Sequence, residues 1–140
     1  FTLMNTGNAD MTVTGGTVKC GGIKTGYALM AAGSAAKLTV SGGDIEAIQS
    51  IGGAQVNISG GSVYCEGVYY ALYNGGGNTS ISGGYFYSPT GKNIYVASGT
   101  VKTTGGYFSD KSAPLESGYK FQDISVTENG NQYNYQVVSE

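Results

Sequence analysis

Five of the Gly-Gly pairs in this sequence lie within the same short pattern of residues. Each copy has a β-branched residue two positions before the pair and a β-branched or aromatic residue two positions after it. The five copies are residues 12–18, 39–45, 57–63, 80–86 and 102–108. Successive pairs start 27, 18, 23 and 22 residues apart, which is typical of a solenoid, in which each repeat packs on its neighbours.

A second short element lies between the Gly-Gly pairs. Four of its copies align as Phe1–Met4, Tyr27–Met30, Glu46–Gln49 and Tyr70–Tyr73, and Asn93–Val96 is a looser fifth. Residues 1–16 also match residues 27–43 almost position for position. The sequence therefore starts within a repeat, and we expect the rest of a larger polypeptide upstream of it.

The segments around each pair are short, alternate in polarity and are rich in β-branched and aromatic side chains, so they predict β-strands. We therefore predict an all-β fold, a right-handed single-stranded parallel β-helix (β-solenoid) of about five coils over residues 1–110. Uneven coil lengths are expected to be taken up in loops at 21–26, 31–37 and 64–69. The alternation places these side chains inside the coils: Val13, Val18, Val40, Ile45, Ile58, Val63, Ile81, Phe86 and Phe108.

The repeat stops after Asp110, and residues 111–140 have a different pattern. Pro114 and Gly118 indicate a loop, and two alternating runs then flank Asn129-Gly130. Asn-Gly between alternating runs predicts a β-hairpin. Because the last coil of a solenoid exposes unpaired backbone and apolar side chains, we expect this hairpin to cap the coils within the same domain.

The two cysteines, Cys20 and Cys65, each lie five residues after the first glycine of their pair, at a position expected to point inward. They are two coils apart, about 9–10 Å at the strand spacing of a sheet, which is too far for a disulfide. We expect two buried thiols that pack as small apolar side chains. The chain has no His to join them in a metal site or a nucleophilic site.

The charge pattern argues against several classes of partner. The chain has no Arg and no His, its seven Lys residues are dispersed, and its formal net charge is −2. Nucleic acid and anionic membrane surfaces need clustered positive charge, and no apolar run approaches the roughly 20 residues that span a bilayer. We expect no nucleic-acid partner, no membrane insertion and no cofactor.

Right-handed β-helices include polysaccharide lyases and hydrolases, whose sites need clustered carboxylates with Arg or Lys beside them. Among the nine acidic residues, Asp44 and Glu46 are close in sequence, and both are expected to face solvent from one strand. A glycosidase pair needs two carboxylates across a cleft, and the neighbouring coils supply no second one. We predict no catalytic and no metal site. The alternative is that this is the C-terminal part of a polysaccharide-acting β-helix enzyme whose catalytic coils lie upstream.

Four tyrosines are the best candidates for a binding site. Tyr64 and Tyr87 align in one outward column, and Tyr85 and Tyr107 align in the next, so stacked coils would gather them on one face. A tyrosine ring packs against the apolar face of a sugar while its hydroxyl group forms hydrogen bonds. This pattern points to a carbohydrate or a host glycoprotein as the ligand.

Two other interpretations of the outward columns stay open. The tyrosines can form a ladder whose role is to stabilise adjacent coils. Regular outward threonines can also order water, as in some ice-binding proteins. The column concerned here mixes its residue types, being Thr12, Thr39, Asn57 and Ser80.

The repeat, written [VI]-[ST]-G-G-x-[VIF], ends with Gly106–Asp110 and is followed by Gly118-Tyr119 and Tyr135–Val138. In these features the chain resembles the β-helix repeat regions of large secreted or wall-attached proteins of anaerobic gut-type bacteria. The resemblance covers nearly the whole chain, but its motifs are structural. It implies an extracellular location at the bacterial cell surface and a role as a stalk, an adhesin or a glycan-contacting module. It implies no catalytic residues.

Overall fold

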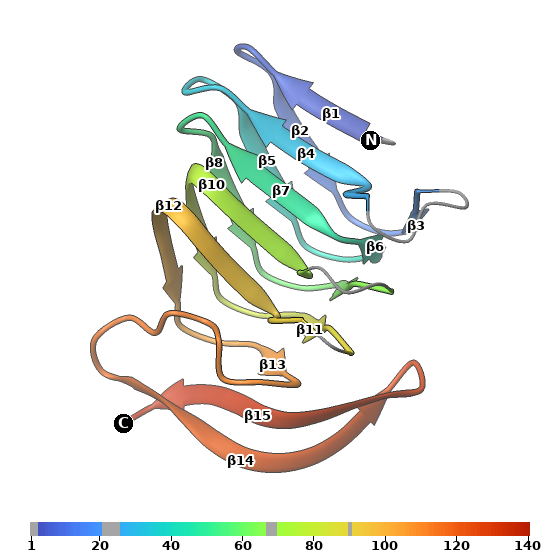
Figure 1. The fold of residues 1–140 in the computed structure, drawn as a ribbon, viewed down its shortest axis with the longest axis vertical. Coiled ribbons are helices and arrows are strands. Elements are labelled where there is room, and N and C mark those ends of the chain that lie inside the picture. Colours follow the sequence, from blue (N-terminus) through green and yellow to red (C-terminus); the bar gives the residue numbers. More distant parts are fainter. Residues whose placement is uncertain (1–2, 21–25, 67–69, 90) are drawn as a thin grey trace.

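The computed structural model describes residues 3–20, 26–66, 70–89 and 91–140, and every regular element within them is a β-strand. The chain winds as a right-handed parallel β-solenoid (Figure 1). Strands β1, β4 and β7 run across the near face, and the chain returns along the far face before each new coil begins. The five strand sets span about four turns between the first set and the last. The fold class predicted from the Gly-Gly repeat is confirmed.

Each coil contributes to three columns of parallel strands. The first column contains β1 (Leu3–Thr6), β4 (Leu29–Ala32), β7 (Ile48–Ile51) and the first halves of β10 (Leu72–Ile81) and β12 (Ile94–Thr103). The second contains β2 (Asp10–Val13), β5 (Lys37–Val40), β8 (Gln55–Ile58) and the second halves of β10 and β12. The third contains β3 (Thr17–Val18), β6 (Asp44–Glu46), β9 (Ser62–Tyr64), β11 (Tyr85–Tyr87) and β13 (Tyr107–Phe108).

The register between coils follows the alignment of the repeats, with one exception. Leu3 pairs with Leu29, Leu29 with Ile48, and Ile48 with Leu72, as the second repeated element predicts. In the fifth coil Leu72 pairs with Ile94, whereas the looser alignment placed Tyr95, the next residue, opposite Leu72. Position 94 carries the apolar side chain that this inward column requires, and Ile94 is buried there.

The loops are shorter than expected where the structure describes them. Residues 31 and 32 belong to β4, and Tyr64 is the last residue of β9. Residues 21–25 and 67–69 of the expected loops lie outside the described residues, as do Phe1 and Thr2 of the first repeated element.

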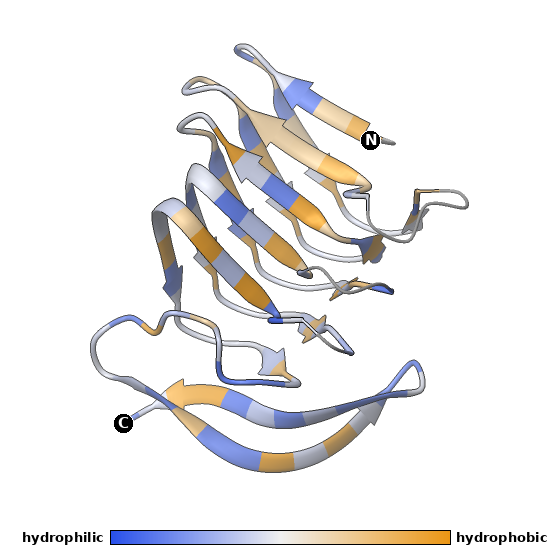
Figure 2. Cartoon of the chain, in the orientation of Figure 1, coloured by the Kyte–Doolittle hydropathy of each residue, from blue (hydrophilic) through white to orange (hydrophobic). Residues whose placement is uncertain are grey.

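The core is a continuous column of apolar side chains inside the coils, and Figure 2 shows the strands that supply them. The nine side chains predicted to point inward are all buried, and Phe86 and Phe108 are fully enclosed. Each buried side chain of this size stabilises the fold by about 1.5–3 kcal/mol relative to leaving it exposed. This column of buried side chains therefore stabilises the stacking of one coil on the next, together with the backbone pairing between coils.

The two glycines of each pair have different physical roles, which Gly60 and Gly61 illustrate. A Cβ atom on Gly60 would overlap the backbone oxygen of Ser41 in the preceding coil. Gly61 has a φ of 85°, in the left-handed region that residues with a side chain rarely adopt. The first glycine permits close stacking of the coils, and the second turns the chain into the third column.

The cysteines differ from the expectation at one of the two positions. Neither forms a disulfide, and Cys65 is buried, as predicted. Cys20 is half-buried, because it belongs to the first coil of the described stack and has coil neighbours on one side.

Strands β14 (Tyr119–Glu128) and β15 (Asn131–Ser139) form the predicted C-terminal hairpin. Asn129 and Gly130 have φ values of 52° and 78°, which is the left-handed pair of a type I′ turn. Strand β15 pairs antiparallel with β13, so the hairpin extends the third column and covers the end of the last coil (Figure 1).

Candidate binding groove

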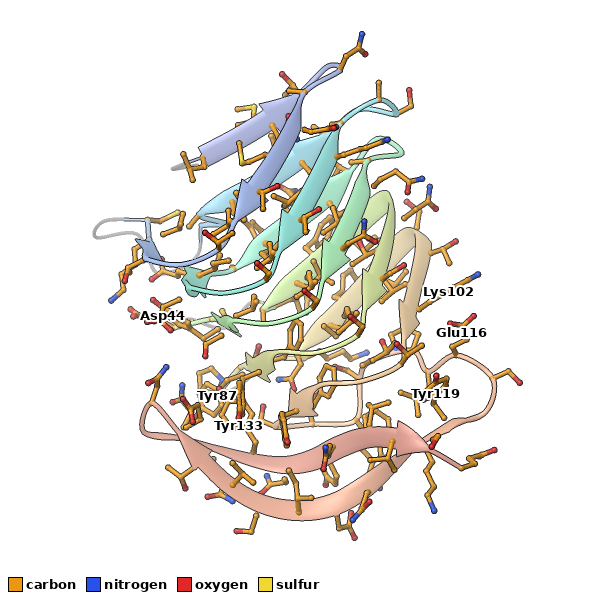
Figure 3. The ribbon with its side chains drawn as sticks, turned by 180° about the vertical axis from the view of Figure 1, so that it is seen from behind. Asp44, Tyr87, Lys102, Glu116, Tyr119 and Tyr133 are labelled. Carbon is orange, nitrogen blue, oxygen red and sulfur yellow. The ribbon has the colours of Figure 1, made fainter. Side chains whose placement is uncertain are left out.

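A groove lies between the outer face of the third column and the tip of the hairpin. Strand β13 is two residues long, so the first half of β15 runs past it and reaches β11. The pairing of β14 with β15 is irregular between Asp123 and Val126, and an irregularity of this kind bends a hairpin. The hairpin therefore curves back over the face of the coils rather than continuing straight (Figure 3).

Two contacts fix the tip of the hairpin over the coils. Tyr133 is 1 % exposed and packs edge-on against Tyr85 and Tyr87, with ring centroids 5.1 and 6.2 Å apart. The side-chain amide of Asn129 donates a hydrogen bond of 3.3 Å to Asp44 Oδ1 in the second coil. Residues 85 positions apart in the sequence thus close the groove from opposite sides.

The groove has a volume of about 580 Å³, within the range of pockets that hold small ligands. Its wall and floor come from the coils, and its other side comes from the hairpin tip. The coils supply Thr17, Lys19, Asp44, Ser62, Tyr64, Cys65, Glu66, Tyr87 and Pro89, and the hairpin supplies Asn129 and Asn131.

The environment of the groove raises the pKa of the Tyr64 phenol, which is neutral at physiological pH. Burial raises its pKa to about 12, and the carboxylates of Glu46, Glu66 and Asp44 add to the rise. A neutral phenol both donates and accepts hydrogen bonds at physiological pH. The groove therefore offers two aromatic rings, Tyr64 and Tyr87, beside hydroxyl, amide and carboxylate groups.

Glu46 corrects the expectation that both acids of β6 face solvent. Asp44 is half-buried at the groove, whereas Glu46 is 3 % exposed. The backbone amide of Cys20, one coil earlier, donates a hydrogen bond of 3.3 Å to Glu46 Oε1. The carboxylate is thus held against the coils, where it accepts a hydrogen bond from a backbone amide.

The four tyrosines predicted as a site lie on the third column, but they divide into two groups. Tyr64 and Tyr87 are paired neighbours and line the groove. The rings of Tyr85 and Tyr107 stack on each other at 4.7 Å and 11°, so each covers a face of the other. Tyr107 also accepts a hydrogen bond from Gln136, and Tyr85 lies against Tyr133. This second pair has the geometry of the ladder interpretation.

Sequence reasoning did not include the hairpin residues Asn129, Asn131 and Tyr133 in the site. The Asn-Gly signal predicts the turn, but it does not say over which strands the turn lies. The direction is set by the short β13 and by the irregular pairing within the hairpin.

A second tyrosine cluster lies outside the predicted site, on the outer face of the first column. Tyr73 and Tyr95 pair across β10 and β12, and their rings stack at 5.7 Å. Tyr70 stacks on Tyr95 at 4.4 Å, and Tyr27 lies 6.0 Å from Tyr73. The signal was present in the repeated element, where Tyr27 and Tyr70 align.

In the described part of the chain, no three His, Cys, Asp or Glu side chains gather into a group that could hold a metal ion. The described residues include no helix long and apolar enough to cross a membrane. The chain matches no known protein family, no curated protein and no solved structure.

Proposed function

We propose that this chain is a non-enzymatic structural and recognition domain that binds carbohydrate in the groove between the coils and the hairpin. One observation carries the proposal: a groove of about 580 Å³ is lined by Tyr64 and Tyr87 and rimmed by polar side chains from two distant parts of the chain. Aromatic rings pack against the apolar faces of sugars, and short polar side chains bind the hydroxyl groups.

The polar groups suit a ligand with many hydroxyl groups. Asp44 accepts hydrogen bonds, whereas Asn129, Asn131 and Ser62 both donate and accept them. Two of these residues come from the hairpin tip and two from the coils, so a bound sugar would be contacted from both sides. The ligand in this proposal is a polysaccharide or the glycan of a host glycoprotein.

The wider setting is also part of the proposal. We place the chain at the extracellular surface of a bacterium, as an adhesin-like part of a large secreted or wall-attached protein with Gly-Gly repeats. The repeat sequence, which resembles such regions in gut-type bacteria, supports this placement. The coils would then act as a rigid support that presents the groove.

The test is binding of the 140-residue chain to a glycan array and to insoluble polysaccharides, compared with the variant Tyr64→Ala/Tyr87→Ala. Loss of two ring contacts of about 0.5–1.5 kcal/mol each should weaken binding about fivefold or more. The matched control is Tyr73→Ala/Tyr95→Ala, which removes two tyrosines from the other tyrosine cluster. It should bind as the unaltered chain does.

Circular dichroism of each variant shows whether the coils remain folded. The proposal fails if the unaltered chain binds no glycan, or if both double variants lose binding equally. Release of shorter saccharides by the unaltered chain would favour the enzyme interpretation over the recognition domain.

A further inference from the structure

The close stacking of the coils leaves a recurrent contact at the first glycine of each pair. In the four later coils, the backbone oxygen of the preceding coil lies against this glycine, and a Cβ atom there would overlap that oxygen. The pairs are Gly42 with Thr14, Gly60 with Ser41, Gly83 with Ser59 and Gly105 with Ser82. A glycine at this position is thus required by the coil that packs on its N-terminal side.

Gly15 occupies the same position in the first coil, but nothing within the described chain requires it. A Cβ atom on Gly15 would meet no atom within 4 Å, and its φ lies outside the left-handed region. Neither the space around Gly15 nor its own backbone therefore explains a glycine there. The backbone oxygen of one more coil, stacked as in the later coils, would explain it.

The strands around Gly15 are also uncovered on this side of the stack. β1, β2 and β3 are the edge strands at this end of the described stack, and Leu3 and Met4 are 40 % and 50 % exposed. Proteins usually protect an edge strand with charged side chains, Pro or a bulge, and these three strands contain one charged residue, Asp10, and no Lys, Pro or bulge. At the opposite end of the stack, in contrast, the hairpin pairs with β13, and Leu115 pairs with Thr103 of β12.

We propose that the face formed by β1, β2 and β3 is an interface for one further parallel coil of the same Gly-Gly type, joined to this chain ahead of Leu3. The residue before the Gly pair of that coil places its backbone oxygen against Gly15. A second copy of the chain could stack in parallel here by its C-terminal face alone, where β15 pairs with β13 and residues 114–116 pair with Thr103 of β12. Two N-terminal faces would meet antiparallel, which does not reproduce the oxygen-to-glycine contact.

The test adds a coil of known sequence. A copy of residues 48–71 is fused directly ahead of Leu3, because Leu72, which follows this segment, is the register equivalent of Leu3. The thermal unfolding midpoint of the fusion is compared with that of the 140-residue chain and of a fusion carrying the same 24 residues in scrambled order. We expect the ordered coil to raise the midpoint by at least about 5 °C, and the scrambled one to leave it unchanged.

Gly15→Ala then distinguishes stacking from nonspecific stabilisation. In the 140-residue chain this variant should leave the midpoint unchanged or slightly raised, because the added methyl group has space. In the fusion it should lower the midpoint by as much as Gly60→Ala does in either protein. Two results would overturn the proposal: no gain from the ordered coil, or a Gly15→Ala variant that is equally harmless in both proteins.

Discussion

Tyr133 buries a titratable hydroxyl group at the junction of hairpin and coils. Its ring is 1 % exposed, and this burial raises its pKa to about 12. The nearby Glu128 carboxylate adds to the rise, and a hydrogen bond with the Asn131 side chain opposes it. In the unfolded chain the same phenol ionises near its ordinary pKa of about 10. The folded state therefore keeps a proton that the unfolded state loses at high pH.

We predict that this group makes the chain sensitive to alkali. Its contribution to the unfolding free energy is fully present below about pH 10 and falls as the pH rises to about 12, by which point the loss is roughly 2–3 kcal/mol. Tyr133→Phe should therefore flatten the fall in unfolding free energy between pH 10 and 12, as measured by urea unfolding. Tyr135→Phe, a half-buried tyrosine on the same strand, is the control. Equal flattening by both variants would contradict the assignment.

The repeat predicts the environment of a single residue where the same contact recurs in every coil. It does not predict that environment where a contact occurs only once. The inward positions, such as Val40 and Ile58, could be predicted because alternation around each Gly pair is local. The burial of Glu46 could not, because it depends on a backbone amide one coil earlier. The same holds for the division of the four tyrosines, which follows from where the hairpin tip lies over the coils.

At the scale of elements, the last coil and the hairpin are joined by aromatic rings more than by backbone pairing. Strand β13 contributes two paired positions to β15. Phe108, however, stacks on Phe86 at 5.0 Å on one side and meets Phe121 of β14 edge-on at 6.2 Å on the other. Phe108 therefore continues the core of the coils into the hairpin.

We predict a measurable coupling between Phe108 and Phe121. Phe108→Ala should cost about 3–5 kcal/mol of unfolding free energy, because its ring is fully buried. A double-mutant cycle with Phe121→Ala should give a coupling energy of about 0.5–1.5 kcal/mol by urea unfolding. The control cycle pairs Phe108→Ala with Tyr73→Ala, which lies in the other tyrosine cluster, and should be additive. Additivity in both cycles would show that the rings do not link the two elements.

Elements could be predicted from the sequence more fully than their placement. The columns of the coils follow from the repeat, and the hairpin follows from Asn129-Gly130. The contact of the hairpin tip with Asp44 spans 85 residues, and no local pattern encodes it. The groove depends on this contact and therefore could not be predicted from the sequence. Its two aromatic residues, Tyr64 and Tyr87, could be.

At the scale of the whole molecule, the two ends of the described stack differ in construction. The N-terminal face exposes edge strands and an unopposed Gly15, whereas the C-terminal face is covered by β15. The third and fourth coils show that the C-terminal face of one coil of this type fits the N-terminal face of the next. We infer that the hairpin, together with residues 114–116 beside Thr103, keeps copies of this chain from stacking on one another.

Removal of residues 111–140, which include both the hairpin and the segment that pairs with Thr103, should consequently turn the chain into a self-assembling unit. The bared face around Phe108 would then match the open face of another copy. The backbone oxygen of Thr104 would lie against Gly15 of that copy, as the oxygen of Ser82 lies against Gly105. We expect the shortened chain to form head-to-tail oligomers that grow with concentration in light scattering, while the 140-residue chain keeps one mass. Gly15→Ala in the shortened chain should suppress these oligomers, since the added methyl group would block the joining contact. Equal aggregation of the shortened chain and of its Gly15→Ala variant would show nonspecific apolar association rather than coil stacking. A shortened chain that stays monomeric would show that the removed residues have no such protective role.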